Sequence, residues 1–375
     1  MKRLLLTCTD LMAIQFLVPH VKYLSENGFS VELACSDVGG RLEELKAVLD
    51  GVAPVHSVRL VRSPFSPGNR KGYGDLKRIV DGSRWDVIWT NEPVMGVMTR
   101  FAAKKARKQG AKVVYMVHGF HFYKGAPLRN WLLYYPVEKY CSRLCDMIVT
   151  INQEDYERAK TFHASNVEKI PGVGVNLDRF CPNNDVRSEW RKKLRLSDSD
   201  VVLLTVGELT HRKNQKIMLD ALYLLKNPNC HLLVCGRGVL EASLKMQVQK
   251  LRLNDQVHFL GYRRDIPQLC CAADIFVFTS RQEGLPCALM EAMASGMAVV
   301  CSDIRGNTDL IDDGFGGFVV PNDAVSVSKA VKALISDKAL CESMGRHNMQ
   351  KVDAFREERA LSAVEKIMVW DRTDR

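Results

Sequence analysis

The sequence predicts an α/β protein built from two doubly wound, Rossmann-like domains. The chain has 375 residues, which suits two domains of ordinary size. Short apolar runs of β type alternate with stretches of helical period along most of the chain, and this alternation indicates βαβ units and parallel sheets. Turn residues gather at Pro171–Asn184, so we expect the boundary between the two domains there.

The front half begins with an expected strand, Arg3–Thr9, whose apolar part is too short for a signal peptide. Four more strands are expected at Ser30–Cys35, Asp86–Thr90, Lys112–Val117 and Asp146–Ile151. Helical periodicity indicates helices between the strands at Gln15–Asn27, Val94–Gln109 and Gln153–Phe162. Gly28 follows the first of these helices and is a suitable C-terminal stop.

The back half starts the same pattern again. Its strands are expected at Val201–Gly207, His231–Cys235, Gln256–Leu260, Ile275–Phe278 and Ala298–Cys301. The segment Phe355–Trp370 is amphipathic at helical spacing. We therefore expect one domain over residues 1–178, a second over 179–355, and a C-terminal helix over 356–375. That helix either caps the second domain or crosses back to the first.

The composition is that of a globular protein in a reducing compartment. Hydrophobic residues make up 46% of the chain and charged residues 26%. The 12 cysteines show neither zinc spacing nor a disulfide framework, and five lie in apolar runs as expected buried thiols: Cys8, Cys35, Cys230, Cys235 and Cys301. No apolar run approaches the roughly 20 residues of a membrane-spanning helix. We expect a cytoplasmic protein.

The net charge of +10 is concentrated in the front half. Residues 1–179 contain 26 Lys and Arg against 18 Asp and Glu, and the remainder contains 27 against 25. This excess indicates an anionic partner, which is a membrane surface, a phosphorylated acceptor or nucleic acid. Simple solubility is the alternative explanation.

One predicted helix concentrates the basic side chains. Its face carries cations at i, i+4, i+7 and i+8, which are Arg100, Lys104, Arg107 and Lys108. Such a face binds anionic lipid head groups at about 1 kcal/mol per residue, or it binds the acceptor. A solvated face is the alternative. The aromatic run Trp131–Tyr135 lines an acceptor site, touches a bilayer, or packs inside the domain.

Two carboxylates eight positions apart mark the most informative stretch, Glu283 to Glu291. Glu283 lies in a Gly/Pro turn after the strand Ile275–Phe278, and Glu291 lies in a helix that Pro286 is suited to begin. A strand–turn–helix step offers backbone N–H groups and a positive dipole end to a phosphate. Flanking carboxylates then suit sugar hydroxyls. A solvated Glu and an ordinary helix-face Glu are the alternative.

Two cations lie at the end of another strand. Arg212 and Lys213 precede a helix expected from about Gln215, where cations oppose the helix dipole unless an anion lies between them. A bound diphosphate accounts for them, and a solvated pair is the alternative. Gly236 opens a Gly-Arg-Gly turn after the strand His231–Cys235, which allows a ligand close to the backbone or makes a tight turn.

His118 follows the strand Lys112–Val117 and is expected at the carboxyl edge of the front sheet, where doubly wound folds bind ligands. Its imidazole suits hydrogen bonding or proton transfer near neutral pH, and a structural histidine is the alternative. Neither half carries an intact Gly-x-Gly-x-x-Gly after its first strand, which argues against a nicotinamide or flavin cofactor.

Taken in order, these motifs resemble the retaining glycosyltransferases of family 4, which have the GT-B fold of two such domains facing across a cleft. The resemblance covers nearly the whole chain and is most similar to the bacterial exopolysaccharide and capsule group. It rests on His118–His121, Ile170–Asn176 with Phe180, Val206–Leu209 with Arg212–Asn214, Phe259–Tyr262, Asp274–Glu291, Asp303–Asn307 and Gly314–Pro321.

The resemblance implies roles for these residues. Arg212 and Lys213 would bind the nucleotide diphosphate, and Glu291 would bind the ribose hydroxyls. The donor sugar would meet Glu283 with the backbone at Gly284 and Leu285, and His118 from the other domain. The backbone near Tyr262 and Arg263 would meet the base, and Gly207 and Gly236 are the remaining donor contacts. The chain departs from the pattern at Glu208, where relatives often carry Arg, at Asp309, where a Glu is usual, and at Thr9–Met12, where relatives have a glycine-rich turn.

The activity implied is transfer of a hexose or N-acetylhexosamine, with retention, from a nucleotide sugar to an acceptor in surface polysaccharide synthesis. Family habit suggests a UDP-linked donor, with GDP and ADP as the alternatives, and a polyprenyl-diphosphate-linked or other glycan acceptor. No cofactor is expected beyond the nucleotide sugar as co-substrate. No Asp/Glu metal cluster stands near the motifs, which predicts metal-independent catalysis. A cytoplasmic protein is expected, with peripheral attachment to the inner face of the membrane left open. The alternatives are a nucleotide-sugar epimerase of the same architecture and a basic nucleic-acid-binding protein.

Overall fold

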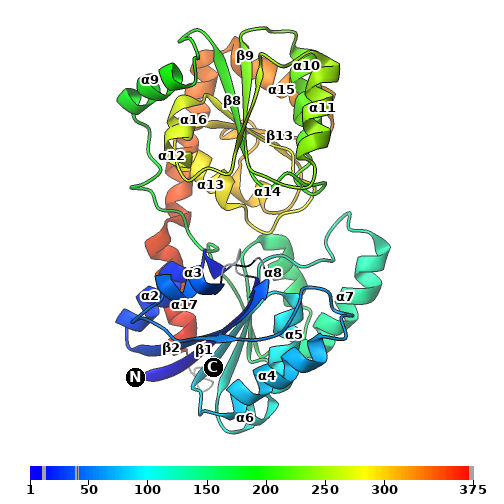
Figure 1. Cartoon of the computed structure of the whole chain (residues 1–375), viewed down its shortest axis with the longest axis vertical. Coiled ribbons are helices and arrows are strands. Elements are labelled where there is room, and N and C mark those ends of the chain that lie inside the picture. The colour runs from blue at the N-terminus through cyan, green and yellow to red at the C-terminus, as the bar shows by residue number, and fades with distance from the viewer. Residues whose placement is uncertain (11–13, 39, 41, 371–375) are drawn as a thin grey trace. The chain divides into compact units, whose positions relative to one another are not determined.

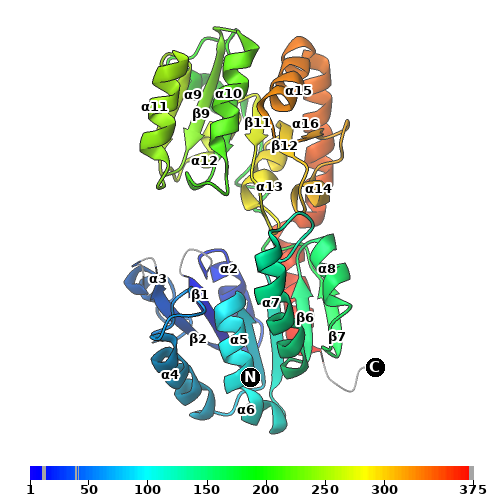
Figure 2. The ribbon, with the colours of Figure 1, turned by 90° about the vertical axis from the view of Figure 1, so that its right-hand side faces the viewer.

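The computed structural model describes residues 1–10, 14–38, 40 and 42–370 and divides the chain into two compact units (Figure 1). Unit 1 comprises Met1–Val173 together with the chain from Glu358 onward, and unit 2 comprises Gly174–Glu357. Each unit is a parallel sheet with helices packed against it, seen from a second side in Figure 2. The prediction of two doubly wound α/β domains is confirmed.

The described part of unit 1 holds a seven-stranded parallel sheet in the order β3-β2-β1-β4-β5-β6-β7. The strands are β1 (Lys2–Asp10), β2 (Phe29–Val38), β3 (Val55–Ser57), β4 (Val87–Asn91), β5 (Lys112–Val117), β6 (Met147–Thr150) and β7 (Asn166–Lys169). The sequence did not indicate β3 and β7. Both are short edge strands with partly exposed side chains, so they lack the continuous apolar run of a buried strand.

Helices flank this sheet on both sides, and their apolar faces form the core of unit 1. They are α2 (Val18–Glu26), α3 (Leu42–Val48), α4 (Asn69–Asp81), α5 (Pro93–Ala102), α6 (Lys104–Lys108), α7 (Leu128–Cys141) and α8 (Gln153–Ala159). The single helix expected over Val94–Gln109 is wrong. The chain breaks at Ala103, where ψ is −4°, so α5 and α6 are separate helices.

The described part of unit 2 holds a six-stranded parallel sheet in the order β10-β9-β8-β11-β12-β13. The strands are β8 (Val201–Val206), β9 (Cys230–Cys235), β10 (Val257–Gly261), β11 (Ile275–Phe278), β12 (Ala298–Ser302) and β13 (Gly317–Val320). Its helices are α9 (Asn184–Lys193), α10 (Gln215–Leu225), α11 (Glu241–Leu251), α12 (Ile266–Ala272), α13 (Cys287–Ala294), α14 (Asn307–Leu310), α15 (Ala324–Ser336) and α16 (Lys338–Val352). The order reverses between β8 and β11, and ligands bind doubly wound sheets at such a switch point.

The last helix, α17 (Glu357–Val369), packs on unit 1. The Tyr23 hydroxyl donates a hydrogen bond to Glu365 Oε2 at 2.8 Å. Lys112 Nζ, at the start of β5, donates to the carbonyls of Ile367 and Met368 at 3.2 and 2.9 Å. Because these carbonyls end the helix, the ammonium also meets the negative end of its dipole. Of the two alternatives for this segment, the structure shows the crossing to unit 1.

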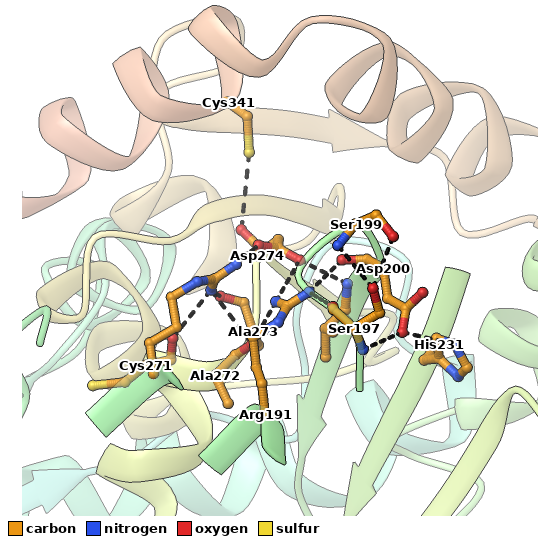
Figure 3. A network of polar contacts seen from close by, with 12 residues as sticks. Arg191, Ser197, Ser199, Asp200, His231, Cys271, Ala272, Ala273, Asp274 and Cys341 are labelled. Carbon is orange, nitrogen blue, oxygen red and sulfur yellow. Dashed lines mark hydrogen bonds and ion pairs between the residues drawn. The ribbon is translucent and has the colours of Figure 1, made fainter. Parts of the chain in front are cut away.

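A buried arginine fastens α9 to the sheet of unit 2 (Figure 3). Arg191 donates to the carbonyls of Ala272 and Ser197 at 3.0 and 2.9 Å and lies 3.4 Å from the Asp274 carboxylate. Asp274 also accepts a hydrogen bond from the Val202 N–H at 2.7 Å. Partners of this kind are what a buried guanidinium requires. Asp274 lies just before β11, so this network holds the amino ends of the strands.

The cysteines follow the sequence prediction. The five expected to be buried are buried, and all 12 are free thiols. Burial raises the pKa of the Cys35 and Cys230 thiols to about 12, so both stay protonated at neutral pH. In the described part of the chain, no helix is long and apolar enough to cross a membrane.

Candidate active site

The site lies in unit 2, where β8 and β11 are neighbours in the sheet. Because the strands are parallel, the loops that follow them leave from the same edge. The loop after β8 carries Arg212 and Lys213, and the loop after β11 carries Glu283. The structure brings these three residues into direct contact, although 70 positions separate Lys213 from Glu283.

Two cations converge on one carboxylate oxygen. Lys213 Nζ lies 2.8 Å and Arg212 Nη1 2.9 Å from Glu283 Oε1. The side chains of Lys213 and Glu283 are 12% and 8% exposed, whereas that of Arg212 is 45% exposed. The three charges sum to +1, and the more exposed guanidinium faces solvent. An anionic ligand is therefore the natural complement of the cluster.

Burial and pairing act in opposite directions on these groups. Burial lowers the pKa of Lys213, although Glu283 opposes that change. Burial alone would raise the pKa of Glu283, but Lys213 and Arg212 outweigh it and lower the pKa. Glu283 is thus ionised and holds both cations in place.

Hydrogen bonds between the two loops fix the cluster. The Arg212 guanidinium also donates to the Gln282 carbonyl at 3.1 Å, and the Arg281 N–H donates to the Arg212 carbonyl at 2.8 Å. The Thr279 hydroxyl donates to the Asn214 carbonyl at 3.0 Å. These bonds join residues 279–282 of one loop to residues 212–214 of the other. The cations therefore sit on a rigid support, which electrostatic catalysis needs.

Three supporting residues were given no role from the sequence, although Asn214 and Arg305 lie in motifs that carry the family resemblance. The Asn322 side chain donates to the carbonyls of Thr279 and Ser280 at 3.0 and 3.1 Å. Arg305 is buried, and its Nε donates to the Glu283 carbonyl at 3.0 Å. Asn214 takes a left-handed conformation, with φ of 55°, directly before α10. Asn322 and Arg305 bind backbone carbonyls that are distant in the chain, and Asn214 contributes its own backbone conformation. No side-chain pattern in the sequence reveals such contributions.

Glycines let the loops of the site approach one another. Gly236 has φ of 145°, and a Cβ there would lie 1.9 Å from the Gly207 carbonyl oxygen. Gly306 has φ of 80°, and its Cβ would lie 2.4 Å from the Gly284 carbonyl oxygen. Packing against backbone is therefore sufficient reason for glycine at both positions. Gly207 lies under Lys213, whose Cε would be 3.3 Å from an added Cβ.

The helix α13 begins beside the cluster. Leu285 is buried, and Pro286 is the N-cap rather than the first helical residue that the sequence suggested. Burial raises the pKa of the Cys287 thiol to about 12, with Glu291 adding to the effect and Lys213 opposing it. Cys287 therefore lies close enough to Glu291 and to Lys213 for both charges to act on its thiol. The positive end of the α13 dipole points toward the same region as the two cations.

Glu291 is half-buried on α13. Burial raises the pKa of its carboxyl to about 7, although Arg179 opposes the change. Among the described residues, none donates a hydrogen bond to this carboxylate, so it is available to ligand hydroxyls. Arg179, which sequence reasoning did not single out, donates to the Arg264 carbonyl at 3.1 Å.

A cavity of about 580 Å³ adjoins Arg179. It is lined by Arg179, Tyr262, Arg263, Arg264, Asp265, Pro267 and Gln268. Tyr262 exposes much of its ring there, whereas Arg263 is held by Asp265, with Nε 2.8 Å from Oδ1. Its side chain is thus engaged within the protein. The cavity offers an aromatic ring and basic groups near Glu291, a suitable combination for a nucleoside.

His118 belongs to unit 1 and has a defined tautomer. The Asn91 side-chain nitrogen donates to the Thr7 carbonyl at 3.3 Å, which leaves Asn91 Oδ1 as the acceptor for His118 Nε2 at 2.9 Å. The proton therefore sits on Nε2, and Nδ1 is a hydrogen-bond acceptor. Burial lowers the pKa of His118 to about 4, so the ring is neutral at physiological pH.

His118 also lines a second cavity, of about 150 Å³. The other lining residues are Glu92, Pro93, Tyr115, Val117, Gly119, Phe120, His121, Phe122, Tyr134 and Glu138. Burial raises the pKa of Glu92, which accepts a hydrogen bond from the Thr9 N–H at 2.7 Å. The residues Leu11 and Met12 of the expected departure at Thr9–Met12 lie outside the described residues.

The basic face expected around residues 100–108 is wrong for two of its four members. Arg100 is fully buried and ion-paired with Glu138 at 2.7 Å, because α5 turns that side toward α7. Arg107 is half-buried and paired with Asp146 at 2.9 Å. Lys104 and Lys108 are exposed, on the separate helix α6. The four side chains therefore do not form one surface for lipid or acceptor.

In the part of the chain that the structure describes, no group of three or more His, Cys, Asp or Glu side chains could hold a metal ion. The two cations at Glu283 are the charged groups placed to meet an anionic ligand. Metal-independent catalysis stays a prediction.

Comparison with known proteins agrees with this architecture. Residues 17–179 match the family model "Glycosyltransferase Family 4", and residues 186–351 match "Glycosyl transferases group 1". The protein EpsD of Bacillus subtilis, named as a glycosyltransferase, is 36% identical over 92% of this chain and 90% of its own. An Escherichia coli relative is 28% identical over 84% of this chain and 83% of its own. It is named as a UDP-Gal:alpha-D-GlcNAc-diphosphoundecaprenol alpha-1,3-galactosyltransferase.

Solved structures share the fold. Anabaena HepE, determined in complex with UDP and glucose, superposes with a TM-score of 0.81 at 19% identity, covering 98% of this chain and 99% of that one. WaaG, a glycosyltransferase involved in lipopolysaccharide biosynthesis, gives a TM-score of 0.75 at 16% identity, covering 98% and 100%. The architecture is thus the GT-B fold. With its two halves matching the two domain models and a full-length relative at 36% identity, the chain belongs to the family 4 glycosyltransferases.

Proposed function

We propose that the protein transfers a hexose or N-acetylhexosamine from a UDP-linked donor to a polyprenyl-diphosphate-linked or other glycan acceptor, with retention and without a metal ion. Such a reaction serves the synthesis of a surface polysaccharide. The donor class is supported by HepE, which was determined with UDP, UDP-glucose, and UDP with glucose. The acceptor class is supported by the E. coli relative, whose name specifies a diphosphoundecaprenol-linked sugar.

The observation that carries the proposal is the convergence of Arg212 and Lys213 on one point at the switch of the unit 2 sheet. When the bond between the anomeric carbon and the phosphate oxygen breaks, the diphosphate gains negative charge. Two fixed cations and the N-terminus of α13 stabilise that charge most where it grows. Removing one such group typically costs about 3–4 kcal/mol of transition-state stabilisation.

Glu283 is proposed to pair with the two cations in the free protein and with the donor sugar in the complex. Without ligand its carboxylate neutralises both cations, at 2.8 and 2.9 Å. A bound diphosphate supplies negative charge to Arg212 and Lys213 in its place, which leaves Glu283 able to accept hydrogen bonds from hydroxyls of the donor sugar. The backbone at Gly284 and Leu285 is proposed to contact the same sugar.

In the proposed reaction the acceptor hydroxyl attacks from the face that the diphosphate leaves. A phosphate oxygen of the leaving group takes the hydroxyl proton, and the new bond forms on the side of the old one, which gives retention. The charges balance because the proton ends on the released diphosphate. The roles of Arg212 and Lys213 are to bind that group and hold its charge.

Glu291 is proposed to accept hydrogen bonds from the ribose hydroxyls, and the cavity at Tyr262 and Arg263 to receive the base. Support comes from the carboxylate of Glu291, to which no described residue donates a hydrogen bond, and from the cavity of about 580 Å³ beside Arg179. His118 is proposed to accept a hydrogen bond from a donor-sugar hydroxyl through Nδ1. Support comes from its Nε2–H, which is already committed to Asn91 at 2.9 Å.

Two measurements test the proposal. The first is thermal shift against UDP-, GDP- and ADP-linked sugars for the wild type, Lys213→Ala, Glu291→Ala and the exposed control Lys216→Ala. Stabilisation by UDP sugars that is lost in the first two variants and kept in the third is expected. If stabilisation survives in both site variants, the donor-site assignment is wrong.

The second measurement is transfer to a diphosphoundecaprenol-linked sugar in the presence of EDTA, with the product analysed by NMR. The proposal requires an axial linkage from an axial donor, because retention preserves the anomeric configuration. An inverted product, or activity that EDTA abolishes, would contradict it.

Two alternatives from the sequence are not favoured. An epimerase would convert the nucleotide sugar with no acceptor present, whereas the family and the named relatives are glycosyltransferases. Nucleic-acid binding was suggested by the net charge of +10 alone. Analysis of the products formed without acceptor tests the epimerase alternative. Retention of RNA at low salt tests the nucleic-acid-binding alternative.

A further inference from the structure

Helix α7 carries apolar side chains on both of its sides. Its inner side packs Trp131, Tyr134 and Tyr135 against the core of unit 1. Its outer side exposes Leu128, Leu132, Leu133, Val137 and Tyr140. At 100° per residue, these five fall on one half of the helix circumference. Leu128 is 73% exposed, Leu132 68% and Tyr140 54%.

Such a face is unusual for a protein surface. Singly scattered apolar residues are normal, but five exposed apolar side chains on one half of a helix, with the cations Arg129 and Lys139 among them, mark a surface that binds something. Figure 1 shows α7 at the outer edge of unit 1, where the sheet of that unit does not cover it. The outer face of α7 is thus open within its own unit.

The surroundings of this face contain an excess of positive charge. Residues 93–137, which span α5, α6 and most of α7, contain no Asp or Glu and eight Lys or Arg. Five of these cations are exposed, namely Lys104, Lys105, Lys108, Lys124 and Arg129. The first carboxylate after the stretch, Glu138, is buried against Arg100 at 2.7 Å. On the α8 side, Glu154 binds the Lys124 N–H at 2.6 Å.

Ring contacts join the cations to the apolar face. The Tyr140 ring stacks on Phe101 of α5 with centroids 6.4 Å apart. Lys104 Nζ lies over the same Phe101 ring, 4.5 Å from its centroid. The ammonium therefore sits at the rim of the apolar row. An apolar strip with cations at its rim is the arrangement by which a helix lies in the boundary between head groups and acyl chains.

We propose that the outer face of α7, with the exposed lysines of α6 at its rim, docks unit 1 on an anionic lipid bilayer. The aliphatic side chains enter the acyl boundary, and the cations bind lipid phosphates. An apolar protein partner would need matching acids at the rim, whereas a bilayer supplies apolar and anionic groups together. The surface extends the proposed function, because it brings the enzyme to a lipid-linked acceptor, but its evidence is independent of the donor site.

Flotation with vesicles tests the proposal. The wild type is mixed with phosphatidylcholine vesicles, with or without 30 mol% phosphatidylglycerol, at about 0.1 M salt. Binding to the anionic vesicles is expected, at least about tenfold stronger than to the neutral ones, since each basic residue adds to the attraction. Equal binding to both, or to neither, overturns the proposal.

Matched variants locate the surface. Leu132→Asp with Leu133→Asp is expected to reduce binding to the anionic vesicles by about tenfold or more, and Lys104→Glu with Lys105→Glu by a similar factor. The controls are Tyr223→Asp with Leu224→Asp, an exposed apolar pair on α10. Wild-type binding is expected for the control. Unchanged binding in the α7 variant would overturn the assignment.

Two further readouts separate this proposal from others. The UDP-induced thermal shift should be unchanged in the Leu132→Asp, Leu133→Asp variant, because the residues proposed to bind UDP lie in unit 2. A lost UDP shift in the wild type would count against the proposed function alone. Light scattering of the wild type without lipid is expected to give a monomer. If the wild type is a dimer and the Leu132→Asp, Leu133→Asp variant is a monomer, a second copy covers this face, and the lipid proposal is overturned.

Discussion

Changing Glu291 to Gln should stabilise the free protein and weaken nucleotide binding at the same time. Burial raises the pKa of the Glu291 carboxyl to about 7, from an ordinary value of 4.5. The folded state therefore binds the proton more tightly than the unfolded state does. Its stabilising effect is complete below pH 4.5 and is lost as the pH rises through 7.

The magnitude follows from the pKa difference. Between pH 5 and 8 the wild type loses at most about 2.5 kcal/mol of stability through this carboxyl, at 1.36 kcal/mol per pKa unit. Solvent reaching the half-buried group lowers this limit. Glu291→Gln has no such loss. For unit 2, the melting-temperature difference between variant and wild type should grow by at most roughly 5–10 °C from pH 5 to pH 8.

The assay is thermal denaturation from pH 5 to 8 with and without UDP, for the wild type, Glu291→Gln and the exposed control Glu342→Gln. Free Glu291→Gln should melt above the wild type at pH 8, whereas its UDP-induced shift should be much smaller. The control should follow the wild type in both respects. A variant that melts below the wild type at pH 8, or that keeps the full UDP shift, would refute the reasoning.

Three further substitutions test the described contacts. In urea denaturation, Gly236→Ala should destabilise unit 2 by roughly 2–4 kcal/mol, because its Cβ would lie 1.9 Å from a backbone oxygen. The control Gly314→Ala should cost only about 1 kcal/mol, because Gly314 has φ of 78° but open space around the added Cβ. Arg100→Ala should cost about 3–5 kcal/mol by leaving its buried carboxylate partner unpaired, and the same unfolding measurement on Lys104→Ala should show little change. Between pH 7 and 5 the wild type should lose about 2 kcal/mol of stability through His118, and His118→Gln should not show this loss. The reason is that the folded protein, with a His118 pKa of about 4, does not take up a proton that the unfolded chain accepts below pH 6.5. Equal losses in the two proteins would contradict this.

The buried strands could be predicted from sequence because their apolar runs are continuous. The ranges Lys112–Val117 and Ile275–Phe278 were predicted with the bounds that the structure gives. The edge strands β3 and β7 could not be predicted, since all their side chains are partly or fully exposed and leave no buried apolar run. Register and edge position are tertiary properties that local propensity does not contain.

The failure at Arg100 has a different cause. Helical periodicity gave the angle at which this side chain leaves the helix, but it did not show what lies on that side. In the fold, α7 supplies Glu138 there, so the guanidinium is a buried ion-pair partner rather than a surface cation. A charged residue within a basic run is ordinarily solvated, and only the tertiary partner changes that expectation.

The candidate site shows the same division. Arg212, Lys213 and Glu283 could be named from loops that follow predicted strands, but their meeting depends on β8 lying beside β11, which sequence order does not give. The supporting roles of Arg305 and Asn322 could not be predicted, because both side chains bind backbone carbonyls of a loop far away in the chain. The charged residues of the cluster could be named from sequence, whereas the hydrogen bonds that hold their loops in place could not be predicted.

Calorimetric titration with UDP and with uridine tests the role of the paired cations most directly. The ratio of the two affinities isolates the diphosphate from the nucleoside. We expect the wild type and Lys216→Ala to prefer UDP strongly, and Lys213→Ala to lose most of that preference while still binding uridine. A preference for UDP that Lys213→Ala retains in full would contradict the assignment of Lys213 to the diphosphate.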